Sequence, residues 1–205
     1  MDLTEHYKKL YVESVPKIEA GNYEIDEMID DESDNRFGIT LVIRPDESTK
    51  ANLQRFLNEV KAIEPDQYYY ENPDLHITVM SIISCYDGFN LNAVNIPDYI
   101  NLLTGILTQH KSFKIRFKGL TASPACILTQ GFAGDFLNEV RDDIRAGFKN
   151  SALQQSIDKR YTIQTAHSTI MRFRAPLKNP GALLAIVEKY RDFDFGTFEV
   201  NKIEL

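Results

Sequence analysis

The sequence predicts an α+β protein built from two similar halves. Segments with strand-like and helix-like patterns are mixed, without the strict strand–helix alternation that a parallel sheet requires. In addition, the order strand, helix, strand with an H-x-T triplet in the last strand occurs twice, at 37–83 and at about 112–173. Because the repeat consists of element order and a shared triplet rather than extended identity, it predicts a duplicated half-domain.

The first half begins with a predicted buried strand over 37–43, where FGITLVI is almost entirely apolar or β-branched. Asp46 is a candidate N-cap for the helix that follows. The apolar face of that helix, at helical spacing, consists of Leu53, Phe56, Leu57 and Val60. A loop with Tyr68, Tyr69 and Tyr70 then leads to a second strand over 75–83, LHITVMSII.

The second half shows the same two periodicities. Phe113, Ile115 and Phe117 alternate with Lys114, Arg116 and Lys118, which is typical of a half-buried strand. Apolar residues three or four apart mark the helices, and Asn179-Pro180 is a cap followed by a first helical position. In chain order the predicted elements are a helix from Pro97, paired strands at 113–118 and 125–129, a helix at 136–148, a strand at 165–173, a helix from Pro180 and a strand at 195–205.

Residues 1–35 are expected to form an acidic N-terminal extension before a single domain at 36–205. Residues 3–13 have helical composition, and Pro16 is expected to interrupt that helix. The extension holds eleven acidic residues and three lysines, so its net charge is −8. Because the whole chain has a net charge of −7, the remaining body has a net charge of +1. A nearly neutral body offers little general attraction for a long duplex, which favours a nucleotide or a short RNA end as the partner.

Several other classes lack support in the sequence. No window approaches the roughly 18 apolar residues of a membrane span, and the first residues lack the apolar core of a signal peptide, so we expect a cytoplasmic protein without a membrane partner. Cys85 and Cys126 are far apart and predict neither a disulfide framework nor a zinc knuckle. A P-loop, a G-x-S-x-G elbow and an H-E-x-x-H motif are all missing.

The two H-x-T triplets carry the predicted chemistry. They are His76-Ile77-Thr78 and His167-Ser168-Thr169. Residues two apart on a strand point to the same side, so each imidazole is expected beside a threonine hydroxyl. Two such strands facing each other would let one imidazole accept a proton from the attacking oxygen while the other protonates the leaving oxygen. The threonine hydroxyls would donate hydrogen bonds to the phosphoryl oxygens. This reaction needs no metal.

The sequence resembles the 2H phosphoesterases, which include bacterial 2′-5′ RNA ligases and cyclic nucleotide phosphodiesterases. The resemblance covers about 36–205 and lies in FGITLVIRP, LHITV, FKIRFKGLTASPACILT, AHSTIMRF and FEVNKIEL. It implies a bilobal antiparallel-sheet fold with helices packed outside and a central cleft that holds both triplets. It also implies His76 and His167 as catalytic residues, with Thr78 and Thr169 at the phosphate. The implied activity is a hydrolase that cleaves 2′,3′-cyclic phosphates or 2′-5′ linkages in RNA processing, without metal or cofactor, and we expect a monomer.

Arg172 corresponds to a basic position behind the second motif of this family and is a candidate substrate-binding residue. In an unbroken strand its odd offset from Thr169 would place it on the opposite side, so this role requires a bulge or the end of the strand.

Three alternatives stay open at this point. The same cleft could belong to a catalytically silent module that binds a nucleotide or RNA end, because fold and motif do not establish turnover. His76 and His167 could ligate a catalytic metal if a further ligand lies nearby. Finally, the basic row Lys114, Arg116 and Lys118 could follow a nucleic-acid backbone, although a solvated strand face is the simpler interpretation. Tyr68, Tyr69 and Tyr70 could stack on bases, although loop packing is the simpler interpretation.

Overall fold

The computed structural model describes residues 2–205. Its elements follow the predicted order closely. The helices are α1 (Leu3–Glu19), α2 (Glu47–Lys61), α3 (Ile96–Leu107), α4 (Phe136–Lys149) and α5 (Pro180–Lys189). The strands are β1 (Phe37–Ile43), β2 (Tyr68–Tyr69), β3 (Ile77–Tyr86), β4 (Phe113–Ser123), β5 (Cys126–Phe132), β6 (Ser168–Arg172) and β7 (Asp194–Val200). Short 3₁₀ helices occur at Glu27–Asp30 and Leu91–Ala93.

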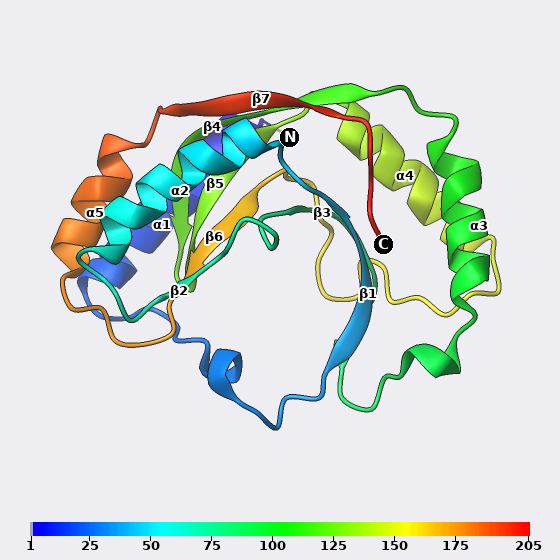
Figure 1. Cartoon of the computed structure of the whole chain (residues 1–205), viewed down its shortest axis with the longest axis horizontal. Helices are drawn as coiled ribbons and strands as arrows, with labels where there is room; N and C mark the ends of the chain where they lie inside the picture. Colours follow the sequence, from blue (N-terminus) through cyan, green and yellow to red (C-terminus); the bar gives the residue numbers. More distant parts are fainter. Residues whose placement is uncertain (1) are drawn as a thin grey trace.

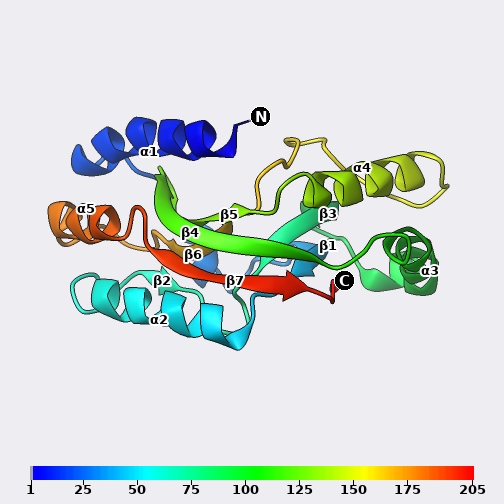
Figure 2. The ribbon, with the colours of Figure 1, turned by 90° about the horizontal axis from the view of Figure 1, so that it is seen from above.

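The strands form two curled antiparallel sheets. One sheet has the order β2-β6-β5-β4-β7, and the other consists of β1 and β3. In Figure 1 the larger sheet lies with α1, α2 and α5, while β1 and β3 lie across from it beside α3 and α4. Figure 2 shows α1 and α2 on opposite sides of the larger sheet. The predicted α+β class and the bilobal antiparallel architecture with outer helices are confirmed.

The two halves interlock through their connecting helices. Helix α2 lies between β1 and β2 along the chain, and it packs against β6 and β7 of the larger sheet and against α5. Helix α4 joins β5 to β6, yet it packs against β3 and α3. Apolar side chains of both sheets and of all five helices belong to one continuous buried cluster. Each triplet is therefore held by elements from both halves of the chain.

Three predicted details outside the H-x-T segments are wrong, and within those segments His76 and His167 lie just before the strands rather than inside them. Helix α1 continues through Pro16 to Glu19, because burial of Ser14 and Ile18 on either side of the proline outweighs the lost backbone bond. Tyr68 and Tyr69 were expected in a loop but form β2, which pairs with β6. The last strand ends at Val200, and beyond it only Glu204 makes a bridge, to Val42.

Within residues 2–205, no helix combines the length and the apolar character needed to cross a membrane.

Candidate active site

His76 lies immediately before β3, between the fully buried side chains of Leu75 and Ile77. Its half-buried ring is fixed by Nδ1, which lies 2.7 Å from the carbonyl oxygen of Asp74. Because a carbonyl oxygen only accepts, Nδ1 carries the hydrogen and Nε2 is left for a ligand. The ring of Tyr70 packs edge-on against the imidazole with centroids 6.5 Å apart.

His167 holds the equivalent position immediately before β6 and is also half-buried. Its Nδ1 lies 2.6 Å from Oγ1 of the buried Thr165, so Nε2 is again left for a ligand. Burial, together with the positive charges of Arg141, His6 and His76, lowers the pKa of His167 to about 4. His167 is therefore neutral at pH 7, and His76 lies within the range of direct electrostatic interaction with it.

Thr78 and Thr169 occupy matching places in the two strands, each followed by a β-bulge. In β3 the register shift leaves Val79 without a partner on β1. In β6 the shift leaves Ile170 without a partner on β5. Each bulge buries two consecutive apolar residues and returns the next residue to the side of the threonine. The half-buried pairs are Thr78 with Ser81 in β3 and Thr169 with Arg172 in β6.

The bulge in β6 brings Arg172 to the same side as Thr169, which was the condition for a role of Arg172 at the phosphate. Cys126 of β5 is paired with Arg172 in the sheet and lies within electrostatic range of it, while its thiol hydrogen-bonds Ser123 Oγ at 3.0 Å. Arg172 Nε donates to the Tyr70 hydroxyl at 3.0 Å, and Nη1 lies 3.4 Å from the Asp26 carboxylate. Since Tyr70 also contacts the His76 ring, it links the two H-x-T segments.

Arg141 is a site residue that the sequence did not reveal. Its side chain is fully buried in α4, and it donates to Thr78 O at 2.9 Å, to Val79 O at 3.0 Å and to Thr165 O at 2.8 Å. It therefore joins the first motif directly to the segment that precedes the second. Burial lowers its pKa to about 10, so the guanidinium stays charged at pH 7. The one sequence signal for Arg141 is its helical position, because it falls on the buried face of α4 with Val140 and Ile144 rather than on the exposed face where arginines of amphipathic helices usually lie.

Helix α1 contributes a second residue of this kind. Tyr7 is 1% exposed, and its hydroxyl donates to Gly131 O at 3.2 Å on β5. Burial raises the pKa of Tyr7 to about 12. A Cβ added to Gly131 would lie 1.9 Å from Ala166 O, so only glycine lets the segment before His167 pack this closely on β5.

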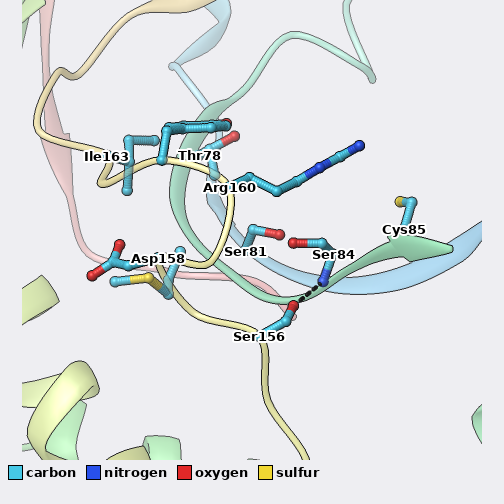
Figure 3. A pocket seen from close by; sticks show the side chains of 10 residues that line it. Thr78, Ser81, Ser84, Cys85, Ser156, Asp158, Arg160 and Ile163 are labelled. Carbon is cyan, nitrogen blue, oxygen red and sulfur yellow. Dashed lines mark hydrogen bonds between the residues drawn. The ribbon is translucent and has the colours of Figure 1, made fainter.

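A pocket of about 120 Å³ opens beside the first motif (Figure 3). It includes Thr78, whereas His76, His167 and Thr169 lie outside its lining. Ser81, Ser84 and Ser156 contribute hydroxyl groups, and the Ser84 amide donates to Ser156 Oγ at 2.7 Å. Figure 3 shows the Arg160 side chain extending past Thr78 and over Ser81. The pocket therefore offers a cation and several hydroxyl groups next to one of the two triplets.

The remaining candidates lie in different surroundings. Arg116 of the basic row pairs with Asp194 at 2.7 Å on the outer surface. Tyr69, in β2, donates its hydroxyl to Glu64 O at 2.6 Å and packs against the core, while Tyr70 lies at His76. In the described part of the chain, no group of three or more His, Cys, Asp or Glu side chains is arranged to hold a metal ion.

Comparison with known proteins agrees with this architecture. The family model described as "AKAP7 2'5' RNA ligase-like domain" matches residues 37–205. The crystal structure of TT0787 from Thermus thermophilus resembles this chain with a TM-score of 0.62 and 17% sequence identity, covering 82% of this chain and 86% of that chain. At that identity the likeness shows the fold alone. No protein with a curated description matches the chain. The chain therefore belongs to the AKAP7 2′5′ RNA ligase-like domain family, within the 2H phosphoesterase superfamily.

Proposed function

We propose that the chain is a metal-independent phosphodiesterase for 2′,3′-cyclic phosphates or 2′-5′ linkages of nucleotides and RNA ends, with His76 and His167 as its acid–base pair. Membership of a 2′5′ RNA ligase-like family supports phosphoesterase chemistry in general. The observation that carries the finer proposal is that both imidazoles are held by Nδ1, and that the charge of one acts on the pKa of the other.

His167 is the better candidate for the general base. A base must be unprotonated at working pH, and the pKa of about 4 keeps His167 neutral. In hydrolysis of a cyclic phosphate, His167 takes the proton of the attacking water as the new phosphorus–oxygen bond forms. His76 enters the step as an imidazolium, with Nδ1–H held by Asp74 O, and gives its Nε2 proton to the ribose oxygen as the bond from that oxygen to phosphorus breaks. Solvent then returns a proton to His76 and removes one from His167.

The other residues fit the charge that develops on phosphorus. The Thr78 and Thr169 hydroxyls can donate to the two non-bridging oxygens, and Arg172 adds a positive charge on the Thr169 side. The pocket beside Thr78, at about 120 Å³, has room for only part of the nucleoside attached to the phosphate. In this pocket, the Arg160 side chain and the Ser81 hydroxyl are the groups that would contact the nucleoside.

The test compares the wild type with His76→Ala, His167→Ala and His110→Ala in buffer containing a chelator. His110 is the matched control because its Nε2 lies 2.9 Å from the Asp143 carboxylate, outside the proposed site. Each protein is offered 2′,3′-cyclic nucleotides and short 2′-5′ oligonucleotides. General acid–base catalysis contributes about 10²–10⁴-fold, so the two site variants should lose at least about a hundredfold in kcat and the control should keep it. Equal turnover by all four proteins contradicts the proposal.

The same experiment separates the alternatives. Tight nucleotide binding by the wild type with no product after long incubation would indicate a silent binding module. Turnover that a chelator abolishes and an added divalent cation restores would indicate a metal hydrolase.

A further inference from the structure

The segment that joins α1 to β1 packs against the chain that follows the second motif. This segment, residues 22–36, is named the acidic strap here, because it holds seven acidic residues and one arginine. It lies before residue 37, where the match to the family begins. In Figure 1 it is the blue segment that passes the end of β6 before it enters β1. The strap therefore brings acidic side chains to the end of β6 that carries Arg172.

Backbone and aromatic contacts fix the strap in this place. The Asp26 amide donates to Phe173 O at 2.8 Å. The Tyr23 ring packs edge-on against the Phe173 ring with centroids 5.3 Å apart, and the Tyr23 hydroxyl accepts from Leu177 N at 2.6 Å. These contacts hold the strap alongside residues 173–177.

Two arginines beside Phe173 each meet an aspartate of the strap. Arg172 and Arg174 lie on either side of the fully buried Phe173, so both side chains project away from the core on one side of the extended chain. Asp26 Oδ2 lies 3.4 Å from Arg172 Nη1, and Asp30 Oδ2 lies 3.4 Å from Arg174 Nε. Each of these two positive charges therefore has a negative partner from the strap.

The pairing leaves Arg172 able to bind one phosphate. A guanidinium has five N–H donors. Arg172 uses Nε for the Tyr70 hydroxyl and one hydrogen of Nη1 for Asp26, which leaves three hydrogens for a phosphate at Thr169. A further phosphate along the same side would approach the carboxylates of Asp26 and Asp30. Repulsion between like charges opposes that approach.

We infer that Asp26 and Asp30 are specificity-determining residues that select a substrate with a single phosphate group, a cyclic mononucleotide, over RNA whose further phosphates would lie along Arg172 and Arg174. This inference rests on the proposed function for the identity of the reacting phosphate. Without the strap, the two arginines would offer two adjacent guanidinium groups, which suit an RNA backbone. With the strap, the same surface is neutral and presents carboxylates, so the discrimination comes from a repulsive element.

The test measures binding, so it does not depend on turnover. The probes are adenosine 3′-monophosphate, with one phosphate, and an RNA trinucleotide with a 3′-phosphate, which has two more. The wild type is compared with Asp26→Asn/Asp30→Asn. The matched control is Glu59→Gln/Asp194→Asn, which also removes two carboxylates, one paired with a lysine on α5 and the other with an arginine on β4.

We expect the wild type to bind both probes with similar affinity and the same salt dependence. Each released arginine should strengthen binding by up to about fivefold at low salt. Asp26→Asn/Asp30→Asn should therefore bind the trinucleotide about 10–25-fold more tightly than the wild type does, and the mononucleotide at most about fivefold more tightly. The plot of log affinity against log salt concentration for the trinucleotide should steepen by about 0.7 for each further phosphate contacted. The control should keep the wild-type values for both probes.

A third variant shows whether the gain comes through the arginine. Adding Arg174→Gln to Asp26→Asn/Asp30→Asn should remove the gain that is specific to the trinucleotide. Equal gains on both probes, an equal gain in the control, a wild type that already prefers the trinucleotide by more than about tenfold, or no binding of either probe would each overturn the inference. Probes that bind as expected to a protein that hydrolyses no cyclic phosphate would instead contradict the proposed function alone.

Discussion

Replacing Arg141 with methionine is expected to loosen both H-x-T segments at once. The three buried carbonyl groups of Thr78, Val79 and Thr165 would lose their donor. A buried acceptor left without its partner costs about 1–3 kcal/mol, and breaking a buried charged network costs about 3–5 kcal/mol. We therefore expect the free energy of unfolding to fall by about 3–5 kcal/mol. The pKa of His167 should also rise, because the Arg141 charge helps to lower it.

Urea unfolding measures the first effect and an NMR titration of His167 measures the second. Arg141→Lys keeps the charge but cannot reach all the carbonyls, so it should lower stability while the pKa of His167 stays depressed. The matched control is Arg55→Met on α2, where an exposed arginine bonds only to Asn52. Arg141→Met with wild-type stability, or with a His167 pKa that is unchanged or lower, would refute this account of the buried guanidinium.

Three further changes test other parts of the site. The pKa of folded His167 is about 4, below its ordinary value of 6.5, so its contribution to stability is complete above pH 6.5 and is lost as the pH falls toward 4. Urea unfolding should show the wild type losing about 3 kcal/mol over this pH range, a loss that His167→Gln lacks. Parallel plots of unfolding free energy against pH for the two proteins would contradict this. Asp26→Asn removes the carboxylate that pairs with Arg172, so KM for an anionic substrate should fall by up to about fivefold at low salt while kcat stays unchanged. An unchanged or raised KM would show that the ion pair does not restrain Arg172. Gly131→Ala should lower the free energy of unfolding by about 1–3 kcal/mol and remove most of the activity. Gly105→Ala is the control, because its added Cβ meets nothing within 4 Å, and it should leave stability and activity nearly intact. Equal effects of the two changes in melting and rate assays would argue against the close approach at β5.

The fold could be predicted because its strands and helices bury one regular face each. Phe113, Ile115 and Phe117 are all buried in β4, and the expected helix starts at Asp46 and Asn179 are hydrogen-bonded caps. Periodicity could not reveal β2, because two residues are too few to show alternation. It also could not show that α1 continues past Pro16, since that depends on burial against the sheet.

The site could be predicted in part, and the missing part depends on contacts between distant segments. The sequence identified the two triplets but placed both histidines inside strands, whereas each lies just before one. The bulge that turns Arg172 toward Thr169 had a signal, because Ile170 and Met171 are two consecutive apolar residues that break the alternation. Arg141 and Tyr7 had no comparable signal. Their roles come from bonds to residues more than sixty and more than one hundred positions away.

A crystal structure of the protein with orthovanadate, a mimic of the phosphoryl group in transfer, tests the convergence of His76 and His167 most directly. We expect one vanadate group with oxygens about 2.6–3.2 Å from Nε2 of both imidazoles. The Thr78 and Thr169 hydroxyls should donate to the same group. Vanadate bound by one imidazole alone, or imidazoles whose Nε2 atoms face away from each other, would contradict the two-histidine mechanism.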